Sequence, residues 1–308
     1  MEASITFKSV AKVVNNNTLL AELTFGVEKN TTFVLVGPNG SGKTAILKLI
    51  CGIINKDKGS IYIKGYDIDV KSHEIKSIIG YMPQKNDIDN ELKIIDNICI
   101  YAQLHGLSEK QSKEKCLLIA DKLNFTDYLY SYPEDLSYGI LRLVLFSRAI
   151  IHDPEILILD EPTSNLDPIY RELIWDYINE INHNKTIFYT TQNFYEAQEH
   201  SDRIAILYDG SIKFNGTFEY LVKNTFGLAR FMISYNKEIP EEIKKNISLN
   251  PKIIKPTMLN NKLKFYSTNK SEFFKILKDS ILNDVNDIDS AKCSLEDIFR
   301  GIEPGDID

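Results

Sequence analysis

Short apolar runs alternate with helix-like stretches along most of this chain. Ile156–Leu159 is continuously apolar, which is typical of a parallel strand buried on both faces. From about Leu92 to Leu129, apolar residues recur every three or four positions and predict a helical insertion between two β-rich halves. Further strands are predicted at 5–7, 23–27, 33–36, 59–63, 78–82, 186–190, 204–208 and 211–214, and further helices at 45–51, 139–152, 170–182 and 194–200.

After Leu221 the composition shifts towards Asn, Lys and Ile, which suggests a second domain. Its pattern predicts the order strand, helix, strand, strand, helix, strand, followed by a last helix from Ser294. This order is that of a ferredoxin-like α+β domain. The predicted domains are therefore 1–220 and 221–308. The predicted elements of the second are strands 230–235, 252–258, 262–267 and 285–290, with helices 240–247 and 271–282.

A glycine-rich loop lies between the predicted strand 33–36 and the helix that follows it. Its eight residues match the phosphate-loop pattern G-x-x-x-x-G-K-[ST], and they are Gly37, Pro38, Asn39, Gly40, Ser41, Gly42, Lys43 and Thr44. Glycines let backbone N–H groups approach phosphate oxygens closely, and the helix adds the positive end of its dipole. Lys43 is expected on the β- and γ-phosphates and Thr44 on Mg²⁺. A plain turn is the alternative, but the flanking strand and helix favour nucleotide binding.

Two carboxylates follow the buried run 156–159, namely Asp160 and Glu161. A carboxylate at the carboxyl end of a central parallel strand points towards the crevice where a phosphate loop lies. Asp160 is placed to hold Mg²⁺ through water, and Glu161 to polarise the attacking water. The alternative is an acidic turn without chemistry.

Composition and charge narrow the classes of function. Hydrophobic residues make up 43% of the 308 and charged residues 26%, which is ordinary for a globular protein. The net charge of −7 argues against a nucleic-acid partner. The four cysteines form no CxxC pair, so reduced thiols in a cytosol are expected rather than zinc or disulfides. No signal peptide is evident, and no apolar run approaches the ~18 residues that span a bilayer, so any membrane association is expected to require a partner.

The order of motifs resembles the ATPase subunit of an ATP-binding cassette (ABC) transporter over residues 1 to about 220. Residues 37–44 match the Walker A loop, and 156–162 match Walker B with its catalytic glutamate. Residues 81–84 match the Q-loop, 136–140 lie at the LSGGQ signature, 164–167 match the D-loop, and Gln192 lies where the family has its switch histidine. The resemblance implies a P-loop α/β ATPase fold with an antiparallel β subdomain and a helical subdomain at about 85–150.

The same resemblance assigns further roles. ATP and Mg²⁺ are the expected cofactors, with Thr44, Gln84 and Asp160 at the metal, and with Ala45 and Val14 beside the nucleotide. Gln84 is also expected to be the hinge to the helical subdomain. Glu161, Gln84 and Gln192 form the expected catalytic set. In this family two ATPase chains meet head to tail, so that Ser137 and Gly139 face the partner chain's nucleotide, in a homo- or heterodimer.

The resemblance also implies a place in the cell and a branch of the family. A membrane-spanning permease subunit is the expected partner, which places the chain in the cytoplasm, peripheral on the inner face of the cell membrane. The segment Ser294–Phe299 is similar to the tail of subunits that serve drug, peptide-antibiotic and lipid exporters. The expected substrate is amphipathic or peptide-like, and its identity stays open.

Three positions depart from the family pattern. Tyr138 and Ile140 interrupt the signature, Gln192 replaces the histidine, and valines stand where an aromatic would stack on adenine. Gln192 would weaken the site that contains this chain's own Walker loops, and Tyr138 and Ile140 the site of the partner. We therefore expect slow hydrolysis, or asymmetric hydrolysis with a partner chain. The rivals are a nucleotide-binding regulator that barely turns over, and a non-transport ABC protein that acts on ribosomes or DNA.

Overall fold

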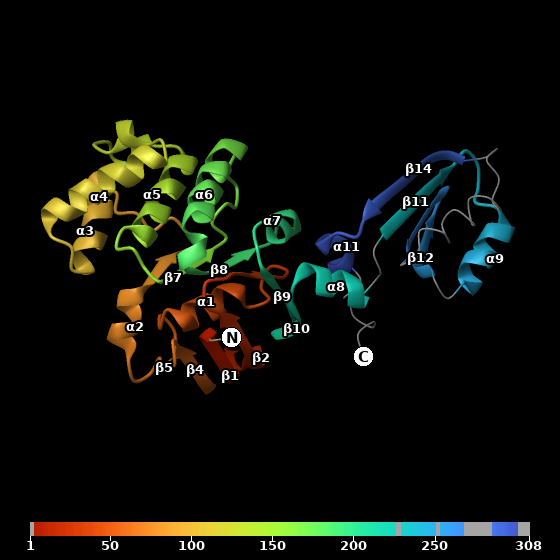
Figure 1. Cartoon of the computed structure of the whole chain (residues 1–308), viewed down its shortest axis with the longest axis horizontal. Coiled ribbons are helices and arrows are strands. Elements are labelled where there is room, and N and C mark those ends of the chain that lie inside the picture. Colours follow the sequence, from red (N-terminus) through yellow and green to blue (C-terminus); the bar gives the residue numbers. More distant parts are fainter. Residues whose placement is uncertain (1–2, 226–228, 251–252, 268–284, 301–308) are drawn as a thin grey trace. The chain divides into compact units, whose positions relative to one another are not determined.

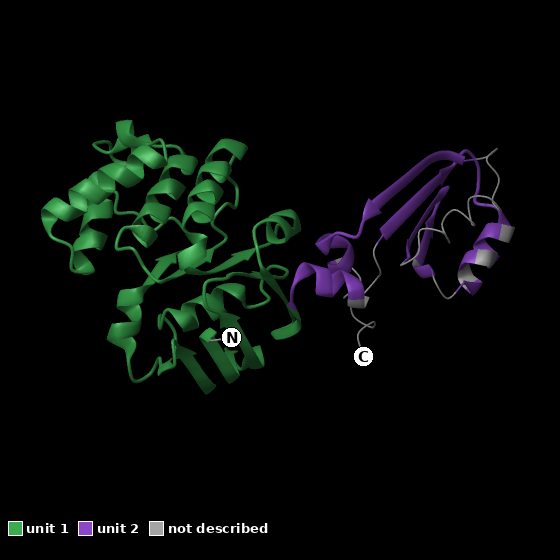
Figure 2. Ribbon diagram, viewed as in Figure 1, with its two compact units in different colours: residues 1–215 green, residues 216–308 purple. Residues whose placement is uncertain are grey.

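The computed structural model describes residues 3–225, 229–250, 253–267 and 285–300. The chain divides into two compact units, residues 1–215 and 216–308 (Figure 2). Each unit has its own hydrophobic core. Within the described residues, no helix is both long and apolar enough to cross a membrane.

A mainly parallel sheet forms the centre of the first unit. Its strand order is β10-β9-β3-β8-β7-β6, and β9, β3, β8, β7 and β6 pair in parallel. Every residue of β3, β7 and β8 is buried, as the continuous apolar pattern predicts for strands covered on both faces. The strands are β3 (Thr32–Val36), β6 (Ile79–Met82), β7 (Ile156–Asp160), β8 (Thr186–Thr191), β9 (Arg203–Tyr208) and β10 (Ser211–Gly216).

A second sheet, antiparallel, packs against the central one. Its order is β2-β1-β4-β5, formed by β1 (Ala3–Val14), β2 (Asn17–Glu28), β4 (Lys58–Ile63) and β5 (Tyr66–Asp67). Phe25 of β2 joins the two sheets: its ring stacks on Phe33 of β3 with centroids 5.9 Å apart and meets Phe188 of β8 edge-on at 6.4 Å. The first two strands extend well beyond the predicted 5–7 and 23–27, because their outer halves carry polar residues that hide the pattern.

The helices of this unit include the predicted helical insertion. In Figure 1, α3 and α4 lie away from the antiparallel strands, and α3 packs on both α4 and α5. Helix α2 was missed and its last residue, Ile78, was wrongly assigned to a strand, because only Ile75 on it is buried and no apolar period is visible. The helices are α1 (Lys43–Ile50), α2 (Ser72–Ile78), α3 (Ile94–Leu104), α4 (Glu109–Lys122), α5 (Tyr138–Ile150), α6 (Pro168–Ile181) and α7 (Phe194–Glu199), with short 3₁₀ turns at Thr126–Tyr128, Pro133–Asp135 and Asn182–Asn184.

The second unit contains an antiparallel sheet of order β12-β13-β11-β14. Its elements are α8 (Phe218–Thr225), β11 (Ala229–Tyr235), α9 (Glu241–Leu249), β12 (Ile253–Leu259), β13 (Lys262–Ser267), β14 (Val285–Lys292) and α11 (Leu295–Arg300). The helix predicted at 271–282 lies outside the described residues. The strand that was predicted at 285–290 is observed two residues longer, as β14.

The tail motif Ser294–Phe299 has a clear structural basis within this unit. The Ser294 hydroxyl accepts from the Asp297 N–H at 3.2 Å while the Asp297 carboxylate accepts from the Ser294 N–H at 3.1 Å, which is a capping box at the start of α11. Lys264 and Tyr266 of β13 also donate to Asp297, each at 3.0 Å. Burial works to raise the pKa of Asp297, but hydrogen bonds from Lys264, Ser294 and Tyr266 outweigh it and lower the pKa to about 2. The motif therefore fixes α11 to the sheet.

Candidate nucleotide site

The glycine-rich loop connects β3 to α1, as its sequence predicts. Gly42, the residue before α1, has φ = 105°, in the left-handed region that L side chains rarely adopt. A Cβ on Gly37 would lie 2.2 Å from the carbonyl oxygen of Leu207, so β9 approaches the loop too closely for any side chain. The two glycines are therefore required by the backbone path, and the loop presents the free N–H groups of α1 to its own concave side.

Lys43 and Ser41 lie inside this loop. The Lys43 ammonium donates to the carbonyls of Gly37 at 2.8 Å and Pro38 at 3.0 Å. Burial lowers the pKa of Lys43, and the negative charges of Glu161 and Asp160 oppose that shift. The Ser41 hydroxyl is buried and has no hydrogen-bond partner among the described residues. A cation and a buried hydroxyl without a partner thus face the same concavity.

Asp160 lies at the carboxyl end of β7, beside the loop. Its Oδ1 accepts from the Thr190 hydroxyl at 2.6 Å, and its buried Oδ2 has no hydrogen-bond partner within the described part of the chain. Burial raises the pKa of Asp160, although hydrogen bonds from the Thr190 and Thr44 hydroxyls favour the charged form. Thr44 and Asp160 are therefore neighbours, and hydroxyl and carboxylate oxygens are the ligands that Mg²⁺ prefers. The unpartnered Oδ2 fits a hydrated Mg²⁺ ion.

Glu161 is held between two glutamine side chains. The Gln84 amide donates to its Oε2 at 3.0 Å, and the Gln192 amide donates to its Oε1 at 2.6 Å. Gln192 also donates to the Asn39 side chain of the phosphate loop at 2.7 Å. The backbone of Glu161 has φ = 47°, a left-handed conformation that costs a glutamate on the order of 1 kcal/mol and is typical of functional sites. The structure thus brings together three predicted catalytic residues from distant parts of the chain.

Arg142 was not predicted from the sequence, although it donates hydrogen bonds to the backbone of the two loops that carry Gln84 and Glu161. Its side chain is fully buried at 0% exposure. Its guanidinium donates to the carbonyls of Pro83 and Gln84 at 3.0 and 2.9 Å, and to those of Glu161 and Pro162 at 2.9 and 3.2 Å. Burial lowers the pKa of Arg142, while the negative charges of Asp160 and Glu161 oppose the shift. The only signal in the sequence was a charge that interrupts the apolar run of α5.

The remaining predicted residues make local contacts. Ser137 caps α5 by accepting from the Ile140 N–H at 3.4 Å, and a Cβ on Gly139 would lie 2.3 Å from the Tyr170 ring. Tyr138 is 42% exposed, whereas Ile140 is 3% exposed and belongs to the packing of α5. Of these two residues, Tyr138 is therefore the exposed one.

Two further positions were predicted to lie beside the nucleotide, Ala45 and Val14. Ala45 is buried in the first turn of α1, directly after Thr44. Val14 ends β1 and is 46% exposed, which leaves its side chain open to an apolar contact.

Comparison with known proteins agrees with this geometry. The family model described as ABC transporter matches residues 20–164. The chain is 30% identical to the Nod factor export ATP-binding protein I of Paraburkholderia xenovorans over 227 residues, which cover 73% of this chain and 75% of that protein. This chain belongs to the ABC transporter ATP-binding family.

The ABC ATPase has other relatives of the same kind. It is 31% identical to the Nod factor export ATP-binding protein I of Mesorhizobium japonicum over 208 residues; the match covers 67% of this chain but only 61% of that relative. Among solved structures, a dimeric ATP-binding cassette bound to ADP and phosphate superposes with a TM-score of 0.64 at 22% identity, covering 69% of this chain and 98% of the other. The last likeness concerns the fold alone.

Proposed function

We propose that this ABC ATPase hydrolyses ATP and that hydrolysis drives export of a substrate through a separate membrane-spanning permease. One observation carries the proposal: the Glu161 carboxylate is held between Gln84 and Gln192, next to Asp160 with its unpartnered oxygen. A carboxylate in that position is suited to accept a proton from water. Fold alone would not support the proposal, because one fold serves many functions.

The residues divide into binding and catalytic roles. Lys43 and the N–H groups of Gly37 and residues 39–45 would bind the triphosphate, and Val14 would contact the adenine. Thr44, Asp160 and Gln84 would hold Mg²⁺, which when bound neutralises charge on the β- and γ-phosphates. Glu161 acts as general base or orients the water, and Gln84 and Gln192 fix the direction of its carboxylate.

The partners follow from the family. We infer a second ATPase chain, identical or different, whose nucleotide faces Ser137 and Gly139 of this chain across a head-to-tail dimer. A permease would place the dimer at the inner face of the membrane, without a role for nucleic acid. The exported substrate is proposed as amphipathic or peptide-like, since the capped tail motif 294–299 resembles that of exporter subunits and the matched relatives are named for Nod factor export.

A regulatory or dimer-stabilising role is proposed for residues 221–308, with residues 1–220 as the ATP-binding domain. We infer a ferredoxin-like fold for this C-terminal domain. The strand order β12-β13-β11-β14, antiparallel throughout, and the helix α9 between β11 and β12 support it.

Substitution of Lys43 tests nucleotide binding directly. In Lys43→Ala, ATP affinity is expected to fall at least ~10-fold, because a charge-assisted contact contributes roughly 1.5–3 kcal/mol. Titration with a fluorescent ATP analogue measures the affinity. Lys48→Ala, on the same helix but in its last turn, is the matched control and should bind like the parent chain. Equal affinity in Lys43→Ala and the control would rule out the proposed site.

Substitution of Gln192 separates the proposed function from its rival, a regulator that barely turns over. Because Gln192 already donates to both Glu161 and Asn39, Gln192→His should change ATP turnover by less than ~10-fold, or less than ~1.4 kcal/mol of barrier. Steady-state phosphate release measures it. A rise of 100-fold would identify Gln192 as the brake on hydrolysis and would favour a regulator as the native role.

A further inference from the structure

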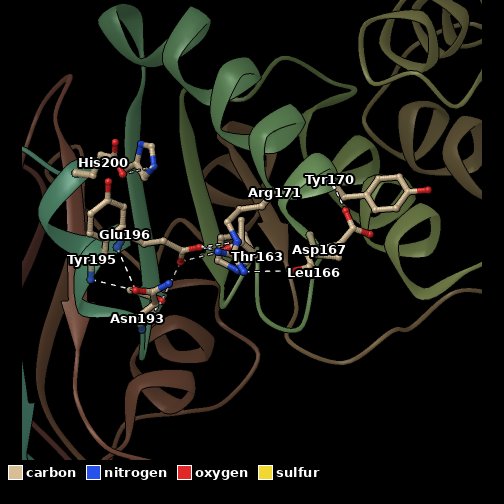
Figure 3. A network of polar contacts seen from close by, with 12 residues as sticks. Thr163, Leu166, Asp167, Tyr170, Arg171, Asn193, Tyr195, Glu196 and His200 are labelled. Atoms are coloured by element: carbon tan, nitrogen blue, oxygen red, sulfur yellow. Dashed lines mark hydrogen bonds and ion pairs between the residues drawn. The ribbon is translucent and has the colours of Figure 1, made fainter.

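A second carboxylate, Glu196 on α7, is buried at 4% exposure. Figure 3 shows it within a network of polar contacts that includes Thr163 and Arg171. The Thr163 hydroxyl donates to both of its oxygens, at 2.8 and 2.9 Å, and the Thr191 hydroxyl donates to Oε2 at 3.2 Å. The Arg171 guanidinium on α6 forms an ion pair with Oε1 at 3.4 Å. One carboxylate therefore joins the loop after β7, the end of β8 and the first turns of α6.

These three contacts lead to residues with roles in the site. Thr191 precedes Gln192, whose amide reaches Glu161. Thr163 lies two residues after Glu161, within the tight turn in which the Ser164 N–H donates to the Glu161 carbonyl at 3.3 Å. Arg171 donates from its other end to the carbonyl of Leu166 at 3.1 Å. The contacts close a ring from Glu161 through the turn 161–167, Arg171 and Glu196 back to Gln192.

The neighbouring caps show why this ring is held in place. The Asn193 side chain accepts from the N–H groups of Tyr195 and Glu196 and starts α7, and Asp167 does the same for α6 at Ile169 and Tyr170. Both helices thus begin at the ring, so their first turns present Arg171 and Glu196 to each other.

We propose that Glu196 is a positioning residue that sets the Gln192 amide against Glu161, and that Arg171 links this setting to the turn Leu166–Asp167. The inference deepens the proposed function and rests on it, since its first effect is on the hydrolysis step. Glu196 touches neither nucleotide nor water in this scheme; it acts through Thr191 and Thr163. If the turn 166–167 moved, Arg171 would move with it, and the change would shift Glu196 and, through Thr191, the Gln192 amide.

The charge of Glu196 is what the ring requires. A carboxylate offers only acceptors: the hydroxyls of Thr163 and Thr191 donate to its oxygens, and the Arg171 guanidinium pairs with Oε1 through its charge. In Glu196→Gln one oxygen becomes an NH₂ group, which meets a donor from Thr163, Thr191 or Arg171. The substitution keeps the size of the side chain and reverses one contact.

Kinetics of the full-length chain test the proposal first. Glu196→Gln and Arg171→Met should each lower kcat for ATP at least ~5-fold and leave KM within ~3-fold, because nucleotide contacts are untouched. Arg171→Lys, which keeps the charge opposite Glu196, should recover part of kcat. Arg203→Met, which breaks the ion pair between Arg203 and Glu28 outside the network of Figure 3, is the control and should turn over like the parent chain.

A double substitution separates positioning from a general loss of structure. If Glu196 acts through Gln192, then Glu196→Gln combined with Gln192→Ala should be no slower than Gln192→Ala alone. If the losses of kcat from the two substitutions multiplied in the double variant, the proposal would be overturned. The proposal would also be overturned if the fall in kcat were explained by a matching fall in the thermal midpoint of unfolding.

The only tryptophan of the chain provides a readout that needs no hydrolysis. Trp175 lies one turn beyond Arg171 on α6, and its ring stacks on His200, just after α7, with centroids 4.1 Å apart. Its fluorescence should change when ADP or ATP is added, and the change should be at least halved in Arg171→Met but retained in Arg203→Met. A nucleotide-induced fluorescence change in Arg171→Met that is as large as in the parent chain overturns the inference. If the parent chain binds nucleotide without turnover, the proposed function fails while the Trp175 comparison still decides this inference.

Discussion

Glu161→Gln is expected to lower ATP turnover by about 10²–10⁴-fold, the usual contribution of a positioned general base. An amide cannot accept the proton of the attacking water at neutral pH. The geometry adds a second effect: both carboxylate oxygens of Glu161 accept from amide N–H groups, so one donor of the new amide must face the donor of Gln84 or Gln192. Single-turnover phosphate release from the purified chain measures the change.

ATP affinity provides the internal check on this variant. Lys43 and the loop amides are unchanged in Glu161→Gln, so the affinity for an ATP analogue should stay within ~3-fold of the parent. Glu155→Gln is the matched control, because Glu155 is 54% exposed and pairs with Lys64 near the surface. If transport or another ATP-driven activity survived in Glu161→Gln without hydrolysis, binding alone would be the working step, as in the regulator hypothesis.

The parts of the site that sequence could predict are contiguous. The phosphate loop and the pair Asp160–Glu161 each depend on spacing within a few residues, next to a strand whose apolar run is unmistakable. Such local patterns predict both the path of the backbone and the chemistry of the side chains. Gln84 and Gln192 were found only through the order of motifs in a known family, and the structure brings both amides onto Glu161.

The parts that sequence could not predict depend on contacts between distant segments. Arg142 and Glu196 look like ordinary charges on helices, and only the fold shows that both are buried. The hydrogen-bond partners of Arg142 lie 19 to 59 residues away in the sequence, and those of Glu196 lie 5 to 33 residues away. The prediction missed helix α2 for a different reason, because Ile75 is the one residue of this helix that is buried. A period-based reading needs several buried positions on one face.

Ile140 illustrates a limit of reasoning from motifs alone. As a departure from the signature it was expected to weaken a contact with the partner's nucleotide, which stays a prediction; what the fold shows is that its side chain is buried in the packing of α5. Its polar counterpart in the family motif is therefore a poor guide to what this side chain does here. Tyr138, the other residue that departs from the expected signature, keeps a side chain that is 42% exposed.

Arg142→Met should destabilise the first unit by at least about 3 kcal/mol, because two buried and two partly buried carbonyls lose a charged donor and each buried acceptor left unpaired costs about 1–3 kcal/mol. Burying the guanidinium has its own cost, which the methionine recovers, so the loss is smaller than the sum of the bonds. Denaturant unfolding of the full chain measures it, followed by a signal from the first unit such as Trp175 fluorescence, with the m-value checked for constancy.

The same substitution should also separate Gln84 from Glu161. Arg142 holds the backbone of both residues, so in Arg142→Met, assayed well below its unfolding temperature, turnover should fall at least ~10-fold while ATP affinity changes little. Arg148→Lys is the control within α5: Arg148 is also buried, but it lies over the Tyr101 ring and donates to the Asp87 carbonyl instead of the catalytic loops. It should lose stability without a specific loss of turnover. Equal losses of turnover at equal stability in the two variants would mean that Arg142 supports the fold and leaves the alignment of the two loops to other contacts.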